Sequence, residues 1–171
     1  MLLLLVRHAQ AGERDPERWP DDRLRPLTRA GRAAHARVSR GLARLGIVPD
    51  LVLTSPWVRA RQTAEIMVEE LGLETEPADC EALTTEPNVA AIFQCFAEAA
   101  PDATIALVGH SPFMEDLASL LLTGAPARMN TDFPKSGVLG LETGRAEAGA
   151  ATLRCFLRPK QMERLRRRKR K

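Results

Sequence analysis

Two histidines and two arginines stand where apolar runs of the sequence end. Arg7 and His8 directly follow the first run, Arg59 lies shortly after the second, and His110 follows the third. A neutral imidazole is a competent nucleophile toward phosphorus and forms a phosphohistidine. A guanidinium is a planar fork that binds phosphate oxygens through paired hydrogen bonds. These residue types together indicate phosphoryl transfer through a histidine.

The elements that must position these side chains alternate between strands and helices. Buried strands are predicted at Leu2–Val6, Leu51–Thr54 and Thr104–Val108, with two further β-like segments at Val138–Glu142 and Thr152–Leu157. Helices are predicted over residues 29–45, 57–71 and 113–122, and another is expected to begin at Pro87 and to carry Val89, Ile92, Phe93 and Phe96. This alternation predicts an α/β fold with a mostly parallel sheet. Ligands bind such sheets beyond the carboxyl ends of the strands, which would gather the four side chains at one edge.

Polar residues and glycines mark where the predicted helices begin and end. Thr28 can cap the first helix through its hydroxyl. Gly46, Gly72 and Gly124 follow the first helix, the second helix and the last one, where glycine commonly ends a helix. Residues 73–86 are expected to be irregular or to hold one short strand.

Two serines add candidate phosphate contacts. Ser55 and Ser111 precede predicted helices, whose N-termini offer backbone N–H donors and a favourable dipole to an anion. For Ser55, capping the following helix is an alternative explanation. A protonated His110 could stabilise the charge that grows on phosphoryl oxygens. No acidic cluster suited to Mg²⁺ stands near these segments, so neither a metal ion nor another cofactor is expected.

The charge of the chain divides into two parts. The 171 residues carry a formal charge of +3, but residues 158–171 contribute +8 and residues 1–157 contribute −5. This division predicts an acidic domain over 1–157 and a basic tail over 158–171. Because the basic total describes neither part, a general affinity for nucleic acid is not expected. The tail is expected to be solvated or to extend as a basic helix, with binding to an anionic partner as the alternative.

Other features exclude several classes of protein. The first apolar run is far too short for a membrane helix or a secretory signal, so we expect a cytoplasmic protein without a membrane partner. The cysteines Cys80, Cys95 and Cys155 are odd in number and widely spaced, so we expect buried reduced thiols, with neither a zinc site nor a disulfide framework. His35 lies among arginines in a predicted helix and is expected to be exposed.

Three segments of the chain carry motifs of a known family. They are Val6-Arg7-His8-Ala9, then Thr54-Ser55-Pro56 with Arg59-Ala60 and Gln62-Thr63-Ala64, and finally Val108-Gly109-His110-Ser111-Pro112. In this order they resemble the histidine phosphatase (phosphoglycerate mutase-like) superfamily. The small size and Arg25-Pro26-Leu27-Thr28-x-x-Gly31 resemble its SixA-type phosphohistidine phosphatase branch. The resemblance covers roughly residues 1–157.

The resemblance implies a three-layer α/β/α sandwich that acts without a metal. It implies that His8 is the nucleophile and that Arg7, Arg59 and His110 form the phosphate pocket. Arg25 matches an arginine that also approaches the phosphate in the small branch.

One departure and one less certain match accompany the resemblance. The first motif usually has glycine where this chain has Ala9, and the added methyl group is expected to be tolerated. Glu81 is the best match to the family's proton donor, with a loop carboxylate at the surface as the alternative.

The function expected from the sequence is therefore removal of a phosphoryl group from a phosphorylated substrate through a phosphohistidine on His8. A protein that carries phosphohistidine is the favoured substrate. A small-molecule phosphomonoesterase of the same superfamily is one alternative. A phosphate-binding adaptor without catalysis is another, although a binding module needs no nucleophile.

Overall fold

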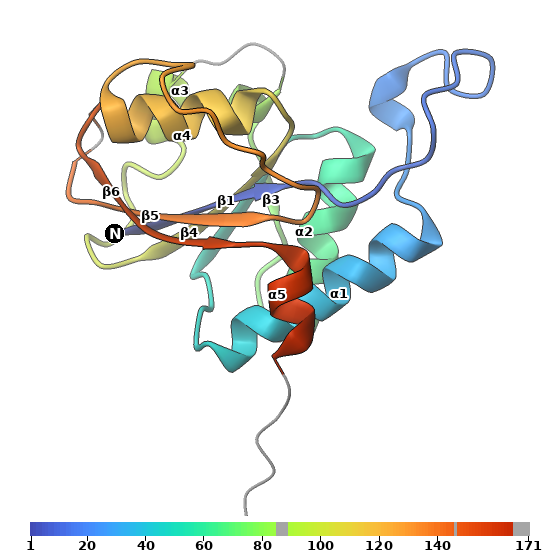
Figure 1. Ribbon diagram of the computed structural model, residues 1–171, viewed down its shortest axis with the longest axis horizontal. Coiled ribbons are helices and arrows are strands. Elements are labelled where there is room, and N and C mark those ends of the chain that lie inside the picture. Colours follow the sequence, from blue (N-terminus) through green and yellow to red (C-terminus); the bar gives the residue numbers. More distant parts are fainter. Residues whose placement is uncertain (85–88, 146, 166–171) are drawn as a thin grey trace, which may run out of the picture.

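A computed structural model describes residues 1–84, 89–145 and 147–165 of the chain (Figure 1). The strands are β1 (Leu2–Arg7), β2 (Leu51–Thr54), β3 (Ala78–Asp79), β4 (Thr104–Gly109), β5 (Val138–Thr143) and β6 (Ala151–Leu157). The α-helices are α1 (Arg29–Arg44), α2 (Val58–Leu71), α3 (Val89–Gln94), α4 (Phe113–Thr123) and α5 (Pro159–Arg164). Short 3-10 helices are η1 (Asp22–Leu24) and η2 (Glu81–Leu83). The elements predicted from apolar spacing are thus present, with ends displaced by a residue or two.

The strands form one sheet in the order β3-β2-β4-β1-β5-β6. The pairs β2–β3, β2–β4 and β1–β4 are parallel, whereas β5 pairs antiparallel with β1 and with β6. The register sets Arg7 opposite Gly109 and Thr54 opposite Val108. The carboxyl ends of β1, β2 and β4 therefore meet at one edge, as a mostly parallel sheet requires.

Helices cover both faces of the sheet and make the predicted three-layer sandwich. Figure 1 shows α3 and α4 over one face, with α1 and α5 against the other. Successive strand residues point to opposite faces, so Leu3 and Leu5 pack in the cluster that includes α3 and α4. Leu4 and Val6 pack in the cluster that includes α1 and α2. The unbroken apolar run of β1 is explained by burial on both faces.

The helix boundaries follow the capping residues of the sequence. The Thr28 hydroxyl accepts a hydrogen bond from the Gly31 N–H at 2.9 Å and caps α1. Gly72 and Gly124 adopt left-handed conformations, with φ of 66° and 82°, and end α2 and α4. The helix start predicted at Pro87 lies outside the described residues, and α3 ends before Phe96, which is nevertheless buried.

Part of the basic segment packs on the domain. Met162 of α5 is 1% exposed and lies in the cluster with Val38 and Leu42 of α1. A Cβ at Gly41 would lie 3.0 Å from the Met162 side chain, so the glycine permits this close approach. The division of the chain at residue 157 stays a prediction, while α5 lies against α1. Within the described ranges, no helix is long and apolar enough to cross a membrane.

Two expectations from the sequence are wrong. His35 is fully buried on the inner face of α1, because it shares the helical stripe of Gly31, Val38 and Leu42 rather than that of the arginines. Of the cysteines, Cys80 is buried as expected, but Cys95 is exposed and Cys155 is half-buried.

Candidate active site

The ends of the central strands bring the two site histidines together. The His8 N–H donates to the Gly109 carbonyl at 2.9 Å, and the Ser55 N–H donates to the Val108 carbonyl at 2.9 Å. The rings of His8 and His110 lie 5.1 Å apart, centroid to centroid. Residues from β1, the β2–α2 junction and the β4–α4 junction therefore share one site.

His8 is buried, neutral and oriented by the backbone. Its Nδ1 lies 2.7 Å from the Ala9 carbonyl oxygen. Because a carbonyl oxygen only accepts, Nδ1 carries the proton, and Nε2 of the neutral ring keeps a lone pair. Burial lowers the pKa of His8 to about 4, against the hydrogen bond to Ala9, and nearby Arg59 and Arg7 lower it further. At neutral pH the ring is therefore an uncharged base with one nitrogen available to attack.

His110 is held by a serine and an indole ring. Its Nε2 lies 2.9 Å from the Ser55 hydroxyl, and its ring centroid is 4.7 Å from that of Trp57. Its Nδ1 is buried and has no hydrogen-bond partner among the described residues. Burial lowers the pKa of His110 to about 3, and the neighbouring His8 and Arg59 lower it further. His110 is thus neutral in this arrangement, in contrast to the protonated form considered from the sequence.

Two arginines border the histidines with unused donors. Arg7 Nη1 donates to the Phe133 carbonyl at 2.6 Å, and Arg59 packs over the Trp57 ring at 4.5 Å. In both arginines Nε is buried without a partner within the described part of the chain. Buried donors normally find acceptors. Together with Nδ1 of His110, these nitrogens are the groups of the site that lack a partner and that a bound oxyanion could satisfy.

A carboxylate ties Arg59 to Arg25. Asp22 accepts from Arg25 Nε at 2.8 Å and pairs with Arg59 Nη2 at 3.1 Å, and its carbonyl oxygen accepts from Arg59 Nη1 at 2.8 Å. The hydrogen bond from Arg25 lowers the pKa of Asp22, and Arg59 lowers it further. Asp22 is therefore ionised and holds both guanidinium groups beside the histidines.

The two serines and Glu81 lie differently from one another. Ser55 contacts His110, whereas the Ser111 hydroxyl donates to Glu115 at 2.6 Å. Glu81 is an exposed residue at the start of η2, and its carboxylate contributes to the raised pKa of Arg23, after the dominant effect of Asp21. The structure thus joins Ser55 to the site, while Ser111 is paired with its own helix.

Three residues of the site were missed by reasoning from the sequence. Trp57 packs against both His110 and Arg59, and Asp22 joins two arginines. Lys135 lies near enough to His8 to lower that histidine's pKa. The position of Asp22 three residues before Arg25 was the one feature of the sequence that could have indicated an ion pair here.

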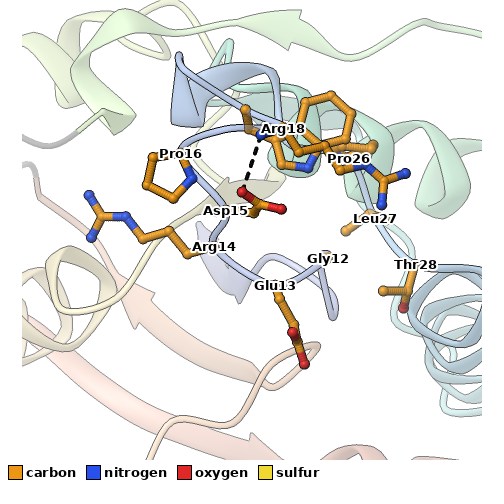
Figure 2. Close-up of a pocket in the computed structure, with 10 residues that line it drawn as sticks. Gly12, Glu13, Arg14, Asp15, Pro16, Arg18, Pro26, Leu27 and Thr28 are labelled. Atoms are coloured by element: carbon orange, nitrogen blue, oxygen red, sulfur yellow. Dashed lines mark hydrogen bonds between the residues drawn. The ribbon is translucent and has the colours of Figure 1, made fainter.

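A cavity of about 600 Å³ lies in the loop between β1 and α1. Figure 2 shows its walls coming from two stretches of that loop. The lining residues are Gly12, Glu13, Arg14, Asp15, Pro16, Arg18, Trp19, Pro26, Leu27 and Thr28. Arg25 Nη1 donates to the Gly12 carbonyl at 2.7 Å, so the cavity adjoins Arg25. Elsewhere, the described residues include no group of three or more His, Cys, Asp or Glu side chains that could hold a metal ion.

Known proteins place this arrangement in a family. The profile described as Histidine phosphatase superfamily (branch 1) matches residues 3–83. An uncharacterised protein of Picosynechococcus sp. (strain PCC 7002) is 36% identical over 155 residues, which cover 89% of this chain and 91% of the relative. The chain belongs to the histidine phosphatase superfamily.

Solved structures specify the branch. The protein histidine phosphatase SixA complexed with tungstate shares the fold, with a TM-score of 0.79, 22% identity, and coverage of 95% of this chain and 99% of that chain. A protein of Agrobacterium tumefaciens that carries the provisional name phosphohistidine phosphatase SixA has a TM-score of 0.72 and 25% identity. The match covers 92% of this chain and 97% of that chain. The branch is that of the SixA-type proteins, and this membership supports phosphatase activity.

Proposed function

We propose that this protein is a metal-independent phosphohistidine phosphatase that acts on a phosphorylated protein. The observation that carries the proposal is the neutral, buried His8, whose Nδ1 is tied to the Ala9 carbonyl so that Nε2 keeps its lone pair. His110, Arg7 and Arg59, each of which has a buried nitrogen without a partner among the described residues, lie near it. A nucleophile beside donors for an oxyanion is what phosphoryl transfer requires.

The reaction has two balanced steps. Nε2 of His8 attacks phosphorus, the bond from phosphorus to the leaving group breaks, the leaving group takes up a proton from solvent, and the phosphoryl group stays on His8. Water then attacks the same phosphorus and gives one proton to solvent, the P–N bond breaks, and inorganic phosphate leaves with His8 restored. The guanidinium groups of Arg7 and Arg59 and the ring of His110 hold the phosphoryl oxygens in both steps. Arg25, which Asp22 links to Arg59, is proposed as a further contact to these oxygens.

The SixA comparison supports the choice of substrate. The SixA structure that shares this fold holds tungstate, a tetrahedral oxyanion of the same shape as phosphate. The leaving group of a phosphohistidine substrate is an imidazole. An imidazole depends less on protonation by an acid of the enzyme than an alcohol leaving group does. This suits a site in which the proton-donor candidate Glu81 is exposed at the start of η2. A cytoplasmic location and an anionic partner for the basic segment stay predictions of the sequence.

A small-molecule phosphomonoesterase is the second candidate. The cavity of about 600 Å³ beside Arg25 favours it, since a compact leaving group could occupy that space. An alcohol leaving group requires a proton in the transition state, so this activity would depend on an acid such as Glu81.

The test of the mechanism is replacement of His8 by alanine. We expect turnover to fall by roughly a thousandfold or more, because the covalent route is lost, and acid-labile phosphate on the enzyme to disappear. His35→Leu is the matched control, since it removes another buried histidine and should keep both signals. Turnover retained in His8→Ala would refute the nucleophile.

The test of the substrate is a comparison of phosphohistidine proteins with alkyl phosphates, in wild type and in Glu81→Gln. We expect phosphohistidine proteins to be preferred and their turnover to change little in Glu81→Gln. A preference for an alkyl phosphate, with large loss in Glu81→Gln, would favour the phosphomonoesterase.

A further inference from the structure

Two cysteines from different elements lie against each other beside the active site. Cys80 precedes η2 and Cys95 follows α3, and their Sγ atoms are 3.0 Å apart. Both are free thiols. Cys80 is 2% exposed, whereas Cys95 is exposed. The pair therefore joins a thiol that solvent reaches to one that it does not.

The backbone holds both thiols in place. The Cys80 N–H donates to the Thr54 carbonyl at 2.8 Å, which attaches it to the end of β2. The Cys95 thiol donates to the Ala91 carbonyl at 3.2 Å, one turn back along the chain. A disulfide needs the sulfur atoms at about 2.05 Å, so an approach of roughly 1 Å would join them.

The two thiols differ in reactivity. Thiol–disulfide exchange needs a thiolate that can reach its partner. Burial raises the pKa of the Cys80 thiol, and the hydrogen bond with Cys95 raises it further. The exposed Cys95 is thus the thiol that an external disulfide meets first, and Cys80 is the one that follows.

We propose that Cys80 and Cys95 are a thiol–disulfide modification site that a low-molecular-weight disulfide, such as oxidised glutathione, converts reversibly into an intrachain disulfide. The Cys95 thiolate attacks one sulfur of oxidised glutathione, forms a mixed disulfide and releases one glutathione thiolate. The Cys80 thiol then loses its proton to solvent, attacks Sγ of Cys95 and releases the second glutathione. Two protein thiols are oxidised, and one glutathione disulfide is reduced to two thiols.

The position of the pair gives the modification a structural consequence. Cys80 directly precedes Glu81, and the Leu83 carbonyl would lie 3.6 Å from a Cβ at Gly109, next to His110. The disulfide therefore ties the segment that carries Glu81 to the end of α3. The hydrogen bonds that hold Cys80 and Cys95 in place run to each other, to Thr54 and to Ala91 rather than to His8, Arg7 or Arg59, so the disulfide can form whether or not His8 is a nucleophile.

The experiment incubates the folded full chain in glutathione buffers of increasing oxidised fraction. Free thiols are then alkylated, and the masses of the intact protein and of its peptides are measured by mass spectrometry. We expect the wild type to lose two hydrogens in mass, to yield a linked peptide of Cys80 and Cys95, and to recover both thiols on reduction. Cys155, which is half-buried, should stay reduced and therefore become alkylated at every oxidised fraction. It is the internal control.

Variants separate the two steps. In Cys80→Ser, Cys95 should accumulate as a mixed disulfide with glutathione. In Cys95→Ser, Cys80 should stay reduced, whereas Cys155→Ser should oxidise as the wild type does. The wild-type measurement stands even if a variant fails to fold. A wild type whose Cys95 stops at the mixed disulfide, or whose thiols both survive oxidation, overturns the proposal.

Discussion

Replacement of the buried His35 is expected to remove part of the acid sensitivity of the fold. Burial lowers the pKa of His35 to about 4, from 6.5 in an unfolded chain, and both ring nitrogens lack a partner among the described residues. Between these two pH values the unfolded chain binds a proton at His35 that the folded chain does not bind. The free energy of unfolding therefore falls as pH decreases through this window.

The magnitude follows from the two pKa values. One pKa unit corresponds to about 1.4 kcal/mol, so the whole window is worth roughly 3 kcal/mol. Between pH 7 and pH 5, His35 should account for about 2 kcal/mol of the loss. His8 and His110, whose pKa values are also lowered, contribute with the same sign. His35→Leu should remove only the part that belongs to His35.

The assay is urea unfolding of wild type and His35→Leu at pH 7 and pH 5. At pH 7 the variant should lie within about 1 kcal/mol of wild type, because leucine removes two unpaired polar atoms while it keeps the volume. At pH 5 it should be the more stable protein. Ala33→His is the matched control, since it adds an imidazole to the exposed face of the same helix. Equal pH dependence in wild type and His35→Leu would refute the assignment of the acid sensitivity to this burial.

Substitutions at three further positions test other contacts of the fold and the site. A Cβ at Gly31 would lie 2.1 Å from the Gln10 carbonyl oxygen, so Gly31→Ala should lower the free energy of unfolding by about 3 kcal/mol in urea; an unchanged midpoint would contradict this. Ser55→Ala removes the hydroxyl at 2.9 Å from His110 and should lower kcat/KM roughly fivefold without changing the circular dichroism spectrum. Trp57→Ala should lower kcat/KM about tenfold by removing the ring packed between an arginine and a histidine, whereas Trp57→Phe should keep most of the activity; equal losses would count against packing as its role.

The frame of the protein and the centre of its site follow from patterns that are local in the chain. Apolar runs and helical spacing are local patterns, so they predicted β1, β2, β4, β5 and β6 with α1, α2 and α4, but not the 3-10 helices η1 and η2. The carboxyl ends of neighbouring parallel strands must lie at one edge. Residues that follow such strands, here His8 and His110, could therefore be predicted to meet without knowledge of side-chain packing.

Which side chains meet across irregular segments depends on how the whole chain folds. Asp22 joins Arg25 to Arg59 through the loop that follows β1, whose course no periodic pattern describes. Cys80 and Cys95 meet because η2 and α3 pack side by side, although they are 15 residues apart in the chain.

The burial of His35 was decided in the same way. Arginines stand within three residues of it on both sides, but the packing of α1 on the domain buries the face with Gly31 and Val38. A helix places residues that are close in sequence on different faces, so arginines two or three residues away say little about the surroundings of an imidazole. Secondary structure follows from periodic patterns of neighbouring residues. A contact between elements depends on how those elements dock, and this is fixed only when the whole chain is folded.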